Sequence, residues 1–206
     1  SGINILDCWM SEPNVRTNIG NSIKNTRDKW IVQGHIGSIW KDGQYSKCHD
    51  LKEAIPAFED LLERFQTDVI DLGMIHFVDG QKELDEILGG DFLKYVQELK
   101  ASGKIRYIGM SSHSPAVALR AVQSGVLDTL MFSINPAFDF LPPTENIDDY
   151  FVKDFEADLA GIDPVRAELY QTCERLDVGL TVMKPFAGGR LFDAARSPFG
   201  VALTPI

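Results

Sequence analysis

The chain has 206 residues, of which 44% are apolar and 24% charged, so it can bury a core and is not a disordered chain. Its net charge of −10 argues against binding to nucleic acid or to an anionic membrane surface, because both need basic side chains. Three widely separated cysteines indicate neither a disulfide framework nor a zinc site, and no apolar run is long enough to span a membrane, so we expect a cytoplasmic protein.

Segments typical of strands alternate with segments typical of helices along the chain. Strands are predicted at 3–9, 29–36, 69–77, 104–112, 128–135 and 178–186. Helices are predicted at 13–26, 51–66, 91–102, 114–125, 164–176 and 191–196. Pro13 suits a first helical turn, Asp50 and Ser114 are suited to N-caps, and Gly103 closes a helix. A long loop is expected at 37–50, and an irregular acidic stretch between Pro136 and Gly161.

The alternation favours a (β/α)8 TIM barrel over a doubly wound open sheet. The strands are nearly continuous apolar runs, as in a parallel sheet covered on both faces. No glycine-rich phosphate motif follows any strand. Polar residues recur where strands end, as they do around one rim of a barrel: Asp7, His35, His76, Ser111, Ser112, Asn135 and Lys184. We therefore expect one domain, residues 1–206.

Three of these polar residues end successive strands. In a barrel, Asp7, His35 and His76 meet at one side of the mouth. Such a group can orient a carbonyl or relay a proton, whereas a histidine at a strand end can equally be a structural residue with its hydrogen bonds satisfied. Both interpretations remain open at this point.

Four segments together resemble the aldo-keto reductases: GINILDCW, VIDLGMIHF, GKIRYIGMSSHSP and GLTVMKPFAGGRL. The resemblance covers almost the whole chain, in order. It implies a TIM barrel and NADPH-dependent reduction of an aldehyde or ketone, a small-molecule carbonyl substrate. By the family pattern the six strands are the second to the seventh, so we expect a partial barrel here and a longer natural protein.

The catalytic residues of the family match only in part. Asp7 corresponds to the aspartate that pairs with the catalytic lysine, and His76 to the histidine that positions the substrate carbonyl. His35 stands where the lysine is expected, and no tyrosine lies near Glu12 or Pro13, where the family has its proton donor. The resemblance therefore suggests Asp7, His35 and His76 as the catalytic group, with His35 as an imidazolium acid in place of tyrosine.

The cofactor-binding residues also match in part. Ser111 and Ser112 correspond to the family's Ser-Asn pair that holds the nicotinamide carboxamide. Met131 replaces a carboxamide-binding glutamine, and Met183 replaces the aromatic residue that stacks on nicotinamide. Lys184 is suited to contact a pyrophosphate, or else it is a solvated rim lysine.

Other residues near the expected mouth allow two interpretations each. Tyr45 is either a substitute acid or an ordinary loop tyrosine, and Trp9 and Trp40 either form a substrate wall or cover the barrel end. His113 is expected at the surface or in a cap. The acidic run at 145–163 is typical of a solvated face and is alternatively a lid or partner site.

Two functional hypotheses follow. The first is an NADPH-dependent reductase of the aldo-keto reductase type. The second is a catalytically degenerate barrel that binds a ligand or partner, since the family tyrosine and lysine are not matched. Some bacterial members with the MKPxAGG motif carry an added iron–sulfur segment, so a 4Fe–4S cluster outside this stretch of chain belongs to the second hypothesis. The sequence indicates neither the substrate nor the oligomeric state.

Overall fold

The computed structural model describes residues 2–140, 146–148, 161–197 and 199–203. Six parallel strands form one sheet in the order β1-β2-β5-β6-β7-β8. Their bounds are β1 Ile5–Cys8, β2 Ile31–Ile36, β5 Ile70–Ile75, β6 Ile105–Ser112, β7 Thr129–Ser133 and β8 Gly179–Met183. Since the strands of this sheet follow one another in chain order without a reversal, the order is that of a barrel and not of a doubly wound sheet.

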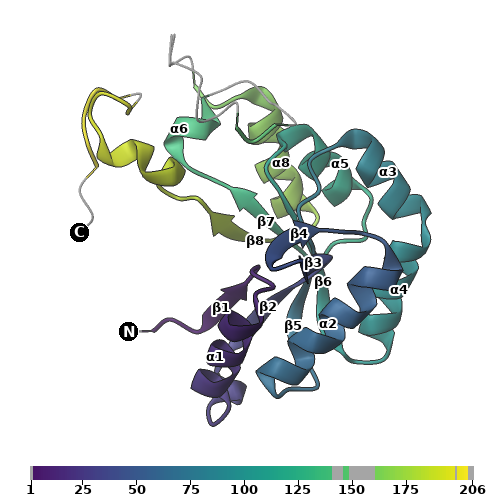
Figure 1. Ribbon diagram of the computed structural model, residues 1–206. Coiled ribbons are helices and arrows are strands. Elements are labelled where there is room, and N and C mark those ends of the chain that lie inside the picture. Colours follow the sequence, from purple (N-terminus) through teal and green to yellow (C-terminus); the bar gives the residue numbers. More distant parts are fainter. Residues whose placement is uncertain (1, 141–145, 149–160, 198, 204–206) are drawn as a thin grey trace.

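Helices follow the strands and cover one side of the sheet. They are α1 Pro13–Ile23, α2 Leu51–Phe65, α3 Gln81–Gly89, α4 Asp91–Ala101, α5 Pro115–Gln123, α6 Pro136–Asp139 and α8 Pro164–Arg175, with 3-10 turns at η1 Arg27–Lys29 and η2 Ala187–Phe192. Figure 1 shows α2, α3, α4, α5 and α8 on the convex side of the curled sheet, and β1 and β8 at its open edges. Among the described helices, none is long and apolar enough to cross a membrane.

The two faces of a strand carry different side chains. In β2, Val32 and Ile36 are fully buried in the main core between sheet and helices. A side chain at Gly34 would lie 2.7 Å from Leu61 of α2, so this face of the strand packs directly on the helix. Because strand residues alternate in direction, Gln33 and His35 point to the opposite, concave face. The concave face is where polar side chains are placed.

A hydrogen bond across the concave face shows that the sheet is strongly curled. The Thr181 hydroxyl of β8 donates to Oε1 of Gln33 in β2 at 3.2 Å, although three strands, β5, β6 and β7, lie between β2 and β8 in the order of the sheet. The edge strands are partly open to solvent, with Ile5 46% and Val182 50% exposed. The structure is thus a curled half-barrel, and the expectation of a partial (β/α)8 barrel is confirmed.

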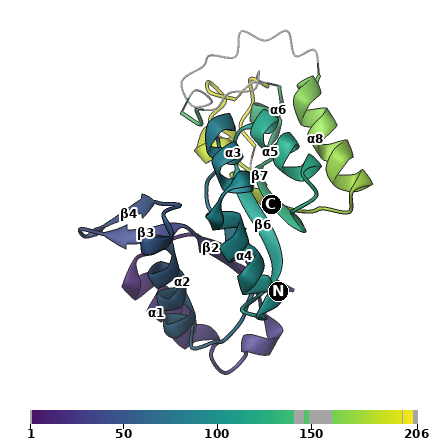
Figure 2. The same ribbon diagram turned by 90° about the vertical axis from the view of Figure 1, so that its right-hand side faces the viewer.

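The stretch 37–50 is not the plain loop that the sequence suggested. It contains an antiparallel hairpin of β3 Ser38–Lys41 and β4 Gln44–Lys47. Asp42 and Gly43 form its turn with φ of 52° and 77°, and two successive positive φ values are what a tight type I′ hairpin turn requires. Figure 2 shows this hairpin beside α2.

The other predicted helices are present with small shifts, except that the helix expected at 191–196 is replaced by the 3-10 helix η2 at Ala187–Phe192 and a turn after it. Asp50 and Ser114 are the N-caps of α2 and α5, because their side chains accept hydrogen bonds from backbone N–H groups of the first turn. Helix α3 was not expected. At the start of the stretch from Pro136, the short helix α6 is ordered by Asn135, whose side chain accepts from the Phe138 N–H. Most of the acidic run at 145–163 lies outside the described residues.

Candidate active site

A cavity of about 490 Å³ opens at the carboxyl ends of the strands, on the concave face. In a parallel barrel this end carries the ligand-binding loops, whereas the opposite end serves stability. The lining comes from five of the six strands, the hairpin and the segments that follow the strands: Asp7, Trp9, His35, Tyr45, His76, Phe77, Ser111, His113, Met131, Val182, Met183 and Lys184.

The three residues predicted as a catalytic group are in direct contact. Asp7 lies in β1, His35 in β2, and His76 directly follows β5. Oδ1 of Asp7 lies 3.0 Å from Nε2 of His35, and Nδ1 of His35 lies 2.7 Å from Nδ1 of His76. The other ring nitrogen of His76, Nε2, lies 2.6 Å from the hydroxyl of Tyr45. Four side chains therefore form one continuous hydrogen-bonded chain, which we call the Asp7–Tyr45 chain.

Hydrogen-bonding capacity assigns a direction to the Asp7–Tyr45 chain. An ionised carboxylate only accepts, so His35 donates to Asp7 through Nε2. A neutral His35 then accepts at Nδ1, which makes Nδ1 of His76 the donor and its Nε2 the acceptor. Burial, with the nearby His35 next in weight, lowers the pKa of His76 from 6.5 to about 2, so the ring is neutral. Tyr45 is consequently a donor to His76.

Tyr45 is fixed in the site by its neighbours. Its ring makes edge contacts with Trp9, at 5.3 Å between ring centroids, and with His76, at 5.6 Å. The hairpin that carries it is tied to the segment after β1, because the Ser38 hydroxyl donates to the Trp9 carbonyl and the Ser11 hydroxyl donates to the Ile39 carbonyl, both at 2.6 Å. Half-burial raises the pKa of the Tyr45 phenol, which keeps it protonated at neutral pH.

The guanidinium of Arg16 also holds the β3–β4 hairpin in place. The Arg16 side chain is 1% exposed and donates to the Ser38 carbonyl at 3.2 Å and to the Ala57 carbonyl at 2.7 Å. It also forms an ion pair with Asp60 at 2.9 Å. Helix α1 is thereby joined to α2 and to the base of the hairpin, so Tyr45 stands on a fixed support.

A second hydrogen-bonded chain reaches the cavity from the other side. Nζ of Lys184 lies 2.9 Å from Nε2 of His113, and Nδ1 of His113 lies 2.9 Å from Oδ2 of Asp79. Oδ1 of Asp79 accepts from the His113 N–H and from the Ser112 hydroxyl. Burial lowers the pKa of Lys184, and the nearby Asp79 opposes that shift. An ammonium group is thus held at the cavity wall by its contact with His113.

The residues predicted to bind a cofactor are brought together with one exception. Ser111, Met131, Met183 and Lys184 all line the cavity. Ser112 does not: it is fully buried, and its hydroxyl donates to Asp79. Ser112 therefore helps to hold Asp79, the partner of His113, and is not part of the cavity surface.

Sequence reasoning underestimated two lining residues. His113 was expected at the surface or in a cap, but it is 7% exposed and bridges Asp79 and Lys184. Tyr45 was placed in a loop, whereas it lies in β4 with its hydroxyl on His76. The signal for Tyr45 was present, because Asp42-Gly43 is a strong hairpin dipeptide. No local pattern indicates the contact between His113 and Lys184.

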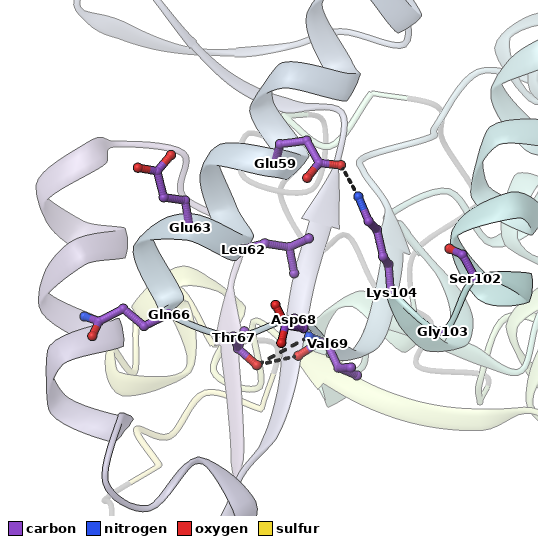
Figure 3. Close-up of a pocket in the computed structure, with 10 residues that line it drawn as sticks. All are labelled: Glu59, Leu62, Glu63, Gln66, Thr67, Asp68, Val69, Ser102, Gly103 and Lys104. Atoms are coloured by element: carbon purple, nitrogen blue, oxygen red, sulfur yellow. Dashed lines mark hydrogen bonds and ion pairs between the residues drawn. The ribbon is translucent and has the colours of Figure 1, made fainter.

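A larger cleft of about 710 Å³ lies at the amino ends of the strands (Figure 3). It is lined by residues from the end of α2 and from the segments that precede β5 and β6. The ion pair across it, between Lys104 and Glu59 at 2.6 Å, leaves both side chains more than 40% exposed. Solvated charged side chains of this kind are little activated by their surroundings. The cavity at the carboxyl ends of the strands is therefore the better candidate for an active site.

Within the described residues, no group of three or more His, Cys, Asp or Glu side chains is arranged to hold a metal ion. All three cysteines are free. Cys8, next to Asp7 in β1, is buried, and burial raises the pKa of its thiol to about 11. It is a packed apolar residue and not a nucleophile.

A cavity at the carboxyl ends of barrel strands, lined by connected titratable side chains, is the arrangement of (β/α)8-barrel enzymes. A sequence model of the aldo/keto reductase family matches residues 2–201, and the chain belongs to that family. This confirms the resemblance carried by the sequence motifs.

Known proteins agree with this assignment. The chain is 31% identical over 145 residues to the uncharacterized oxidoreductase YqkF of Bacillus subtilis, covering 68% of this chain and 45% of that relative. The holo form of aldo-keto reductase AKR11C1 from Bacillus halodurans superposes with a TM-score of 0.68 at 23% identity, over 92% of this chain and 55% of that one. An aldo/keto reductase from Klebsiella pneumoniae in complex with NADP and acetate gives 0.59 at 21% identity, over 94% and 57%. The chain therefore spans about half the length of the relatives it matches.

Proposed function

We propose that this protein is an oxidoreductase that uses NADPH to reduce the carbonyl group of a small aldehyde or ketone. The observation that carries the proposal is the Asp7–Tyr45 chain, which brings a carboxylate, two imidazoles and a phenol to the wall of one cavity at the carboxyl ends of the strands. Family membership and the NADP complex of the Klebsiella pneumoniae relative support it.

The lining of the cavity fits the nicotinamide end of such a cofactor. Met131, Val182 and Met183 give it an apolar wall suited to a flat ring. The Ser111 hydroxyl oxygen accepts from the Phe77 N–H at 2.8 Å, and no acceptor among the described residues takes its hydrogen, which leaves it for a carboxamide oxygen. The Lys184 ammonium is the cation for a phosphate group. When bound, the reduced nicotinamide supplies the hydride that adds to the carbonyl carbon.

The side chains of the Asp7–Tyr45 chain act on the carbonyl oxygen. Asp7 orients His35, and His35 in turn fixes the tautomer and orientation of His76. His76 in turn bonds to the Tyr45 hydroxyl, which faces the position of the substrate oxygen, where negative charge develops during reduction. We place the protein in the cytoplasm, with a small-molecule substrate and neither nucleic acid nor a membrane as partner, in keeping with its net charge of −10.

Binding and turnover test the proposal separately. The intact protein is titrated with NADPH while tryptophan fluorescence is recorded, and NADPH oxidation is then followed with a panel of aldehydes and ketones. Trp9 lines the cavity, so we expect saturable quenching that is reduced in Trp9→Phe but retained in Trp40→Phe. We expect oxidation that is strongly reduced in His76→Ala.

The outcomes separate the two functional hypotheses. Absence of saturable quenching would contradict a nicotinamide-dependent activity. Tight NADPH binding without oxidation of any carbonyl in the panel would favour the degenerate, ligand-binding barrel. Equal oxidation rates in His76→Ala and the parent protein would remove the Asp7–Tyr45 chain from the mechanism.

A further inference from the structure

The Tyr45 end of the Asp7–Tyr45 chain brings a hydroxyl group to the cavity, whereas the two histidines lie behind it. His35 is 2% exposed, and both of its ring nitrogens are engaged, one by Asp7 and one by His76. His76 is 4% exposed, and its two nitrogens are engaged by His35 and Tyr45. Tyr45 is less buried than either histidine. Direct proton donation from His35 to a substrate is therefore blocked, because Asp7 and His76 occupy its two ring nitrogens.

We propose that Tyr45, presented by the β3–β4 hairpin, is the proton donor to the substrate oxygen, and that His76 and His35 resupply its proton from the end held by Asp7. The proposal deepens the proposed function and rests on it. The family pattern has its tyrosine acid near Glu12, where this sequence has none. The proposal supplies a tyrosine acid from a different segment of the protein, the β3–β4 hairpin.

The step requires one extra proton on the chain before reaction. With that proton, His35 is an imidazolium that donates through Nε2 to Asp7 and through Nδ1 to His76. The Asp7 carboxylate stabilises this charge at 3.0 Å. His76 stays neutral but carries its hydrogen on Nε2 and donates it to Tyr45, whose own hydrogen is then free to point at the substrate oxygen.

Proton transfer then follows the same path. When the carbonyl carbon receives the hydride that a bound reduced nicotinamide would supply, the carbonyl oxygen takes the Tyr45 hydrogen and becomes an alcohol. Tyr45 takes the Nε2 hydrogen of His76, and Nδ1 of His76 takes the Nδ1 hydrogen of His35. His35 is left neutral, with its remaining hydrogen on Nε2 toward Asp7, and solvent restores the extra proton. One hydride and one proton are consumed per carbonyl reduced.

The relay explains why a phenol with a raised pKa serves as an acid here. Burial makes the Tyr45 phenolate costly, so a phenol that simply lost its proton would be a poor donor. Because His76 replaces the proton during the same step, no isolated phenolate has to form. The extra proton resides on His35, the histidine in contact with a carboxylate.

Activity measurements test the donor. In Tyr45→Phe we expect carbonyl reduction by the intact protein to fall about 10²–10⁴-fold, with NADPH quenching of tryptophan fluorescence retained. Tyr107→Phe is the matched control, because Tyr107 is 52% exposed and is not among the residues that line the cavity, and it should leave the rate unchanged. An active parent protein with an equally active Tyr45→Phe would overturn the proton-donor role alone. A parent protein that reduces no carbonyl overturns the proposed function, and the donor role with it.

A measurement on the resting protein tests the relay without turnover. At pH 9, nitrogen-15 NMR of the histidine rings should show His76 as a neutral ring with hydrogen on Nδ1 and an accepting Nε2. Tyr45→Phe removes the donor to that nitrogen, so the Nε2 resonance should shift toward that of an unbonded ring nitrogen. A hydrogen on Nε2 of His76 at pH 9, or an Nε2 resonance that does not respond to Tyr45→Phe, would overturn the relay.

Discussion

Both ends of the half-barrel carry titratable side chains, but the two ends use them differently. At the carboxyl end, titratable side chains are buried and joined in two hydrogen-bonded chains, Asp7 to Tyr45 and Asp79 to Lys184. At the amino end, the larger cleft of about 710 Å³ is lined by solvated carboxylates and one exposed ion pair. Volume alone would therefore favour the amino end, whereas burial and hydrogen bonding favour the carboxyl end.

Burial and hydrogen-bond connectivity, not the size of a cleft, distinguish the candidate active site from the cleft at the amino end. A buried imidazole changes its pKa by several units, whereas an exposed carboxylate stays close to its ordinary value. Asp71 is a buried carboxylate at the amino end, but its partners are structural: two arginines and a backbone N–H. Substitutions at the two ends should accordingly alter different properties, activity at one and stability at the other.

The largest effect is expected on activity from Asp7→Asn. The asparagine removes the charge that stabilises an imidazolium on His35. Its amide nitrogen is a donor, whereas Nε2 of His35 needs an acceptor at this position. We expect carbonyl reduction to fall about 10²–10⁴-fold, with a small change in stability. Asp68→Asn, a charge-matched change in the amino-end cleft, should leave the rate unchanged. A comparable loss in both variants would abolish the distinction between the ends.

The next largest effect is expected on stability from Asp71→Ala. Asp71 is 5% exposed and accepts from Arg27 at 2.7 Å and from the Val32 N–H at 2.9 Å. Its removal leaves the buried Val32 N–H without its acceptor and deprives Arg27 of its ion-pair partner, although Arg27 keeps the carbonyls of Trp30 and Val69. We expect a cost of about 3 kcal/mol in the free energy of unfolding. Urea denaturation measures this loss. Asp71→Asn retains an acceptor and should lose less, and equal losses in the two variants would contradict this explanation.

A smaller effect is expected on the pH dependence of stability through His76. Burial lowers the pKa of His76 from 6.5 to about 2 in the folded protein. Below pH 6.5 the unfolded chain therefore binds a proton that the folded protein does not, and this residue makes stability fall as the pH falls toward 2, by about 1.4 kcal/mol per pH unit. Unfolding free energies of the parent protein and His76→Gln should converge or cross as the pH is lowered from 7.5 to 5. Parallel curves would show that His76 is protonated in the folded state.

The smallest effect is expected from Glu59→Gln in the amino-end cleft. Its ion pair with Lys104 joins two side chains that are 47% and 41% exposed, so water and salt screen it. We expect a loss below about 1 kcal/mol in the free energy of unfolding and no change in the rate of carbonyl reduction. A substantial change in the rate would indicate that this larger cleft, and not the cavity at the carboxyl ends, takes part in the reaction.

The sequence predicted the strands well because they are nearly continuous apolar runs with polar residues at their ends. The six strand segments and the N-caps Asp50 and Ser114 are where they were expected. The hairpin at 38–47 was missed although its Asp42-Gly43 turn is a clear local signal. Helix α3 was also missed.

The candidate site was predictable only where it depends on strand ends. Asp7, His35 and His76 were expected to meet because the carboxyl ends of neighbouring parallel strands lie side by side. Ser111 and Ser112 were predicted together, although strand alternation directs neighbouring residues to opposite faces. Only the structure shows that Ser111 is the one that faces the cavity, whereas Ser112 bonds to Asp79.

The sequence by itself therefore determined the family, the barrel class and the residues at the strand ends, because these depend on periodicity and on motifs that are local in the chain. Only the tertiary structure decided which side chains form hydrogen bonds with each other in the cavity. The contact of Tyr45 with His76 spans 31 positions and that of Lys184 with His113 spans 71. Both depend on how a hairpin and a strand are packed around the cavity, and on anchors such as Arg16 and Ser38 that hold the hairpin in place. A hydrogen bond needs a geometry that no local pattern encodes.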